Sequence, residues 1–146
     1  MPTARHKRMN APADIYIRKF VNNQDAALDV TVVNPLQLAL VDRAATTAGH
    51  ALDYARRRKL NQSYEACRQE GIAFIPLPVE TLGAWHPQAV DTIKRIASAA
   101  AKETHKDIAE STKHFFQRLS VLLVKDNSAL FLSRKPISYS ASMLGD

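Results

Sequence analysis

The chain has 146 residues, of which 46% are hydrophobic and 23% are charged. This is the length and composition of one globular domain, and it excludes a wholly disordered chain. Lysine and arginine outnumber aspartate and glutamate by 20 to 14, which gives a net charge of +6. A basic domain favours a polyanionic partner, and nucleic acid is the first candidate.

Cysteine content and hydropathy restrict the cellular compartment and the partners expected for the protein. The single cysteine, Cys67, excludes an intramolecular disulfide and a multi-cysteine zinc site, so we expect a reducing, intracellular compartment. No run approaches the roughly 20 apolar residues that a membrane span needs, so we expect no membrane partner. Nothing in the sequence indicates an oligomeric state.

Three segments are expected along the chain. Residues 1–11 carry Arg5, Lys7 and Arg8 without apolar periodicity, which predicts a basic arm. Residues 12–134 alternate strand-like and helix-like patterns, which predicts the folded domain. Residues 135–146 show neither pattern, which predicts a flexible tail.

A β-hairpin is predicted near the amino terminus. The segments Asp14–Val21 and Ala27–Val33 are rich in strand-forming residues, and a polar turn over 22–25 separates them. A period of two along the second strand puts Leu28, Val30 and Val32 on one apolar face, expected to be core. Asp29 lies on the opposite face, where an acid among apolar neighbours indicates a site or a satisfied pair.

The rest of the domain reads as helices around a third strand. The apolar stripe from Pro35 to Leu60 predicts one long helix, and Ile72–Val79 predicts a strand parallel to the second. Together they form a right-handed βαβ unit. Two further helices are expected, over about 87–102 and about 107–125, and Asp126-Asn127 is expected to end the second. The predicted fold class is α/β, with a small mixed sheet.

The hairpin acids are the first candidate site. Metal-dependent cleavage of phosphodiesters needs two carboxylates that converge on Mg²⁺, and hairpin arms can bring Asp14 and Asp29 together. The alternative is a turn aspartate at Asp14 and a satisfied core aspartate at Asp29, because acidic pairs are common. Spacing alone favours this alternative.

Several short motifs resemble a known family when they are taken in order. They are Pro12-Ala13-Asp14, Ala27 to Val32, Asn34-Pro35-Leu36, Arg58-Lys59, Cys67, Gly71 and Phe74 to Leu77. Over 12–97 the chain resembles the PD-(D/E)xK restriction-endonuclease-like superfamily, and in particular the domain downstream of reverse transcriptases in site-specific non-LTR retroelements. The resemblance implies a Mg²⁺- or Mn²⁺-dependent DNA endonuclease. Asp14, Asp29 and the carbonyl of Val30 would be metal ligands.

The sequence departs from that family in two places. Thr31 stands where the signature lysine is expected, and the resemblance implies that Lys59 on the following helix replaces it. The family core also begins with a helix and a strand before the first acid. We therefore expect a copy truncated at its amino terminus, derived from a longer parent with a reverse-transcriptase module. A nuclear location is expected if the source is eukaryotic.

Three functions remain open at this point. The first is a DNA endonuclease, active or decayed, in which Asp14, Asp29 and Lys59 carry catalysis. The second is a non-catalytic nucleic-acid-binding remnant, in which Arg5, Lys7, Arg8, Arg56, Arg57 and Arg58 bind phosphates. For Arg56 to Lys59, the simpler alternative is that these cations cap the end of the long helix. The third is a protein-interaction module formed by the last two helices.

Overall fold

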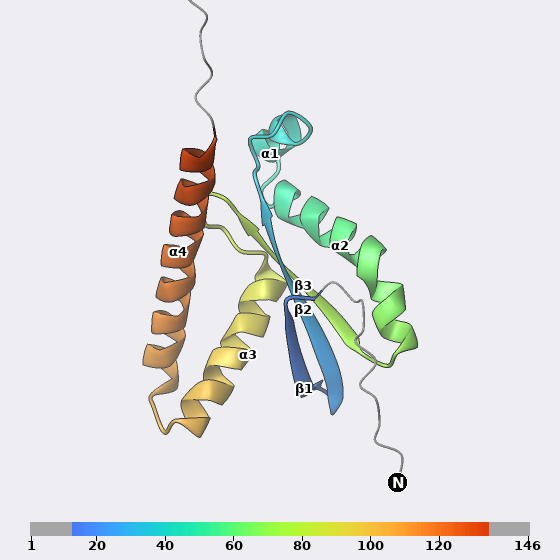
Figure 1. The fold of residues 1–146 in the computed structure, drawn as a ribbon, viewed down its shortest axis with the longest axis vertical. Coiled ribbons are helices and arrows are strands. Elements are labelled where there is room, and N and C mark those ends of the chain that lie inside the picture. The colour runs from blue at the N-terminus through green and yellow to red at the C-terminus, as the bar shows by residue number, and fades with distance from the viewer. Residues whose placement is uncertain (1–12, 135–146) are drawn as a thin grey trace, which may run out of the picture.

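The computed structural model describes residues 13–134, which form a three-stranded sheet with helices on both faces (Figure 1). The elements are β1 (Ile15–Val21), β2 (Gln24–Val33), α1 (Val41–Thr46), α2 (His50–Gln69), β3 (Ala73–Glu80), α3 (Pro87–Glu103) and α4 (Ile108–Ser133). β2 is central, antiparallel to β1 and parallel to β3. The predicted α/β class, hairpin and third strand are confirmed. The predicted basic arm and tail lie outside the described residues.

The hairpin turn is tighter than expected. Asn22 and Asn23 both have positive φ, 48° and 64°, and Val21 pairs directly with Gln24. Two successive residues of positive φ are typical of the two-residue turns that match strand twist, and asparagine tolerates this conformation. β2 therefore starts at Gln24 instead of Ala27.

The prediction of one helix over 35–60 was wrong. After Val33 the chain makes turns and the short α1, and Gly49 then adopts φ +76° as the N-cap of α2. A left-handed residue cannot continue a right-handed helix, so two helices form instead of one. α2 then runs past Leu60 to Gln69. The cations at 56–59 therefore lie in mid-helix, and the capping explanation for them is also wrong.

The two faces of the sheet are covered unequally. On one face Cys67 of α2 packs against Ala27 and Phe74, and on the other α3 covers Leu28 around Ala89. The expectation that Val30 and Val32 join the core was wrong, because they are 39% and 51% exposed. They lie beyond the part of β2 that α3 covers. The opposite face of β2, which carries Asp29, is better covered, and Asp29 itself is buried.

The last two helices form an antiparallel pair beside the sheet (Figure 1). α3 matches its prediction closely, whereas α4 continues through Asp126-Asn127, and Asn127 donates a side-chain hydrogen bond to the carbonyl of Thr81. Leu123 is the only buried residue of α4. Leu122, one position before it, is exposed. No helix within residues 13–134 is long and apolar enough to cross a bilayer.

Candidate functional site

Asp29 and Lys59 meet between β2 and α2. The alternation of β2 turns Asp29 toward α2, where its side chain is only 6% exposed. Lys59 Nζ lies 2.8 Å from Asp29 Oδ2, and the Lys59 side chain is 25% exposed. The hydroxyl of Thr31 approaches the same oxygen at 3.4 Å. The structure thus brings together an acid and a lysine that are far apart in the sequence, and the ion pair compensates a buried charge.

Asp14 lies next to this pair at the open end of β1. The antiparallel register pairs Ile15 with Leu28, so the next position along places Asp14 opposite Asp29. Oδ2 of Asp14 accepts a hydrogen bond of 2.8 Å from the backbone N–H of Val30. This bond orients an exposed carboxylate toward the strand that carries the second acid.

The two prolines of β3 explain which way the backbone of Val30 faces. Pro76 and Pro78 have no N–H to donate, and they are paired in register with Asp29 and Thr31. The backbone hydrogen bonds between β2 and β3 must therefore be made by the residues of β3 that alternate with these prolines. In a parallel pair, alternate residues of each strand bond to the neighbouring strand, and in this register the N–H and carbonyl of Val30 point away from β3. Its carbonyl consequently faces the side on which Asp14 lies.

These donors suit a small hard cation. Carboxylate and carbonyl oxygens are the ligands of Mg²⁺, which keeps several waters and needs few protein ligands. Oδ1 of Asp14 and Oδ1 of Asp29 have no hydrogen-bond partner within the described part of the chain. The same residues contain no cluster of three or more His, Cys, Asp or Glu side chains that could hold a metal. The donor set therefore fits a sparsely ligated ion, not a fully enclosed one.

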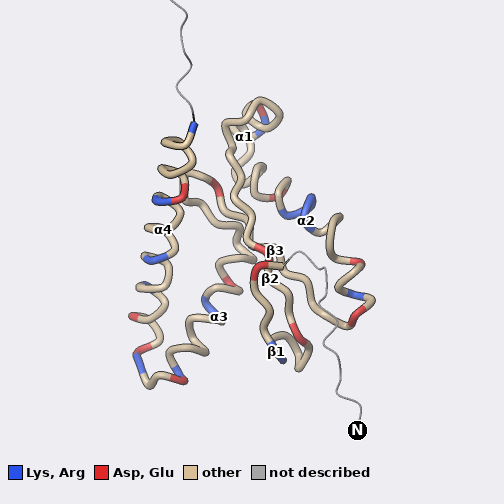
Figure 2. The backbone as a smooth tube through the Cα atoms, viewed as in Figure 1, with Lys and Arg blue, Asp and Glu red and all other residues tan. Residues whose placement is uncertain are grey.

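The basic cluster of α2, Arg56 to Lys59, forms one continuous stretch in the middle of the helix (Figure 2), and its side chains differ in burial and contacts. Arg56 is half-buried, and its Nε donates a 2.7 Å hydrogen bond to Gln88 at the start of α3. Arg57 and Arg58 are exposed and form no ion pair with any described residue. Of the three arginines of α2 predicted to bind phosphates, two are therefore available to a ligand, and the third is engaged within the fold.

A hollow of about 400 Å³ opens beside Lys59, between the end of β2 and α2. The sequence analysis named Thr31, Arg58 and Lys59, which line it, but assigned no role to its other polar side chains. These are Asn34, Gln37, Tyr54 and Gln62. Tyr54, Arg58 and Gln62 recur every four residues, which is the spacing of one helix face. That signal becomes readable only once the bounds of α2 are known.

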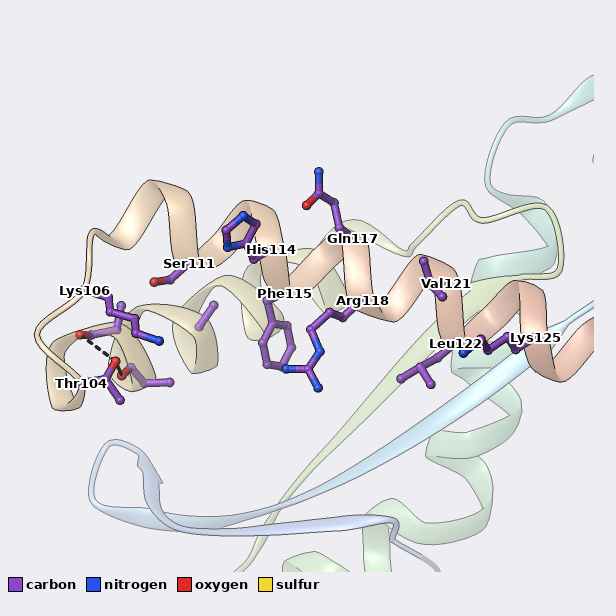
Figure 3. Close-up of a pocket in the computed structure, with 13 residues that line it drawn as sticks. Thr104, Lys106, Ser111, His114, Phe115, Gln117, Arg118, Val121, Leu122 and Lys125 are labelled. Carbon is purple, nitrogen blue, oxygen red and sulfur yellow. Dashed lines mark hydrogen bonds between the residues drawn. The ribbon is translucent and has the colours of Figure 1, made fainter.

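A larger groove of about 740 Å³ lies away from the acids, between α3 and α4 (Figure 3). Its wall combines the apolar Phe115 and Leu122 with the cationic Arg118 and Lys125, and none of the described carboxylates lines it. Exposed apolar residues continue along α4, including Val124 and others near its end. This surface has the apolar character that the interaction-module hypothesis requires.

Comparisons with protein-family models, with curated proteins and with solved structures find no match for this chain. The resemblance to PD-(D/E)xK nucleases and the retroelement origin therefore stay predictions. They depend on the residues quoted in the sequence analysis. The chemistry of the site depends on the arrangement of Asp14, Asp29 and Lys59 in this fold.

Proposed function

We propose that this domain binds DNA and cleaves phosphodiesters in a metal-dependent reaction at Asp14, Asp29 and Lys59. One observation carries the proposal: Lys59 Nζ lies 2.8 Å from the buried Asp29 carboxylate, next to the position of Asp14. Two acids on the hairpin that can share a metal ion, with the Lys59 ammonium of α2 beside them, suit metal-assisted hydrolysis of a phosphodiester. The net charge of +6 supports a polyanionic substrate.

Each residue has a distinct task in this reaction. Asp14 and Asp29 would hold Mg²⁺ together with the carbonyl of Val30, and the Val30 N–H keeps Asp14 oriented. When bound, the ion supplies an activated water and neutralises charge that develops on the phosphate. The Lys59 ammonium orients a phosphoryl oxygen and stabilises its growing negative charge. Thr31 cannot supply that charge, because its hydroxyl is neutral.

A nicking assay on supercoiled plasmid tests the proposal. We expect wild-type protein to nick DNA with Mg²⁺ or Mn²⁺, and Asp29→Asn or Lys59→Met to lower the rate by at least about 100-fold. Asp91→Asn is the matched control, because Asp91 is an exposed acid on α3, away from the site. Absence of nicking by the wild type with either metal would contradict cleavage. So would full activity in Asp29→Asn.

A second candidate is DNA binding without cleavage. It is favoured by the neutralisation of Asp29, whose charge Lys59 already balances, and by the exposure of Arg57 and Arg58. Each phosphate contact contributes about 0.9 to the slope of log affinity against log salt. Replacing Arg57 and Arg58 with Ala should therefore lower that slope by about 2 for any DNA sequence.

Arg56→Ala is the matched control for this binding experiment. Its guanidinium is held by Gln88, so it should change the salt slope less than either neighbour. An unchanged slope in the variant lacking Arg57 and Arg58 would remove the basic cluster from DNA binding.

A further inference from the structure

The hollow between the end of β2 and α2 has the chemistry of a nucleotide pocket. Its volume of about 400 Å³ falls in the range of small-ligand sites. Thr31 and Lys59 line it, so it opens directly beside the acid and lysine pair. No carboxylate of residues 13–134 lines it. An anionic ligand can therefore enter without repulsion from its wall.

The polar groups on the wall match the edges of a base. Amide side chains offer both donors and acceptors, and the hollow holds three of them, Asn34, Gln37 and Gln62. Neither Gln37 nor Gln62 forms a side-chain hydrogen bond with another described residue, whereas Asn34 uses only its oxygen, toward the N–H of Leu36. These amides are therefore available to a ligand.

Tyr54 adds an aromatic face to the same hollow. Its side chain is partly exposed, and it lies one turn before Arg58 on α2. Aromatic rings stack on unpaired bases with little dependence on sequence, and an adjacent arginine can hold the phosphate. A second hollow of about 440 Å³ continues from Tyr54 and Arg58 to Arg57 and Asn61. A single strand of DNA can therefore extend along α2 beyond the first nucleotide.

We infer that this hollow binds one unpaired nucleotide of DNA, with its base stacked on Tyr54 and its phosphate on Arg58. The inference rests on the proposed function and specifies its substrate as DNA with an unpaired nucleotide next to the reacting phosphate. A base inside a duplex is stacked and paired, so it cannot enter the hollow without leaving the double helix.

Fluorescence anisotropy in EDTA tests the inference without any cleavage. The probes are a labelled single-stranded oligodeoxynucleotide, its duplex, and an abasic oligomer of the same length. Tyr54→Ala should weaken single-strand binding about tenfold, because stacking contributes roughly 1–3 kcal/mol per base. Tyr54→Phe keeps the ring and should bind within about twofold of the wild type. The matched control is Tyr64→Ala, which removes an exposed tyrosine of α2 outside the hollow and should change nothing.

The abasic and duplex probes separate stacking from other effects. Tyr54→Ala should not alter their affinities, because neither probe presents an unpaired base. Equal weakening on all three probes would overturn the inference, as would unchanged single-strand binding in Tyr54→Ala. If the wild type binds none of the probes, the proposed function fails as well. If it binds DNA but ignores Tyr54, only the nucleotide pocket fails. Melting curves confirm that each variant is folded.

Discussion

Replacing Lys59 with Met tests whether the ion pair compensates a buried charge. At 2.8 Å the gross attraction of the pair is roughly 6 kcal/mol for an effective dielectric constant of about 20. Most of this is offset by desolvation, which costs several kcal/mol per ion. Lys59→Met removes the attraction but leaves the desolvation of Asp29, a loss of about 3–5 kcal/mol in fully buried pairs. Because Lys59 is 25% exposed, we expect about 2–3 kcal/mol.

Thermal or urea denaturation measures this loss. For a domain of this size it corresponds to roughly 6–10 °C in Tm. The double variant Asp29→Asn/Lys59→Met should be more stable than Lys59→Met, because it no longer buries an unpaired charge. Lys94→Met is the matched surface control and should stay within about 0.5 kcal/mol of the wild type. If Lys59→Met costs no more than Lys94→Met, the reasoning about the pair is refuted.

Magnesium added to the same melts separates a metal site from an ion pair. A cation that binds only the folded state stabilises it by about 1.4 kcal/mol at tenfold excess over its Kd. We expect a rise in Tm for the wild type, a larger rise for Lys59→Met, in which Asp29 lacks its competing cation, and none for the double variant. No rise in any of the three would refute the metal site and leave the ion pair intact.

Three further outcomes follow from the core, the cysteine and the hairpin. Leu28 is fully buried, so Leu28→Ala should cost about 3 kcal/mol in urea unfolding, and a loss below about 1 kcal/mol would contradict its core position. Burial raises the pKa of the Cys67 thiol, so a thiol reagent should modify it only upon unfolding, and rapid labelling of the native protein would disprove its burial. Hydrogen bonds from the Tyr16 hydroxyl and a backbone N–H lower the pKa of Asp25. A lowered folded-state pKa stabilises the fold above the unfolded-state value and loses this effect in acid. Melts below about pH 4 should therefore show a steeper loss for the wild type than for Tyr16→Phe, and parallel curves would contradict it.

Local signals in the sequence were sufficient for the hairpin and the third strand. Alternation along β2 and the asparagine pair at the turn act between neighbouring residues, so they can be read without knowing the fold. The same alternation set Asp29 apart from its apolar neighbours. The fold class and the acid of the site could thus be predicted from the sequence.

The bounds of the helices were harder to predict, because competing local energies are small. Glycine costs only about 1 kcal/mol inside a helix, so Gly49 was no reason to end the predicted helix. In the structure the positive φ of Gly49 separates α1 from α2. Asp126-Asn127 likewise failed to end α4, where Asn127 bonds across to Thr81. Tertiary contacts outweigh such preferences.

Which surfaces are covered was decided by the tertiary structure alone. Val30 and Val32 carry a core pattern yet stay exposed, because α3 packs only alongside the other half of β2. The distance from Lys59 to Asp29 and the hollow lined by Tyr54 and Gln62 both depend on how α2 crosses the sheet. Periodicity tells which residues share a face of one element. Only the packing of elements determines what that face meets, because burial is a property of two surfaces in contact.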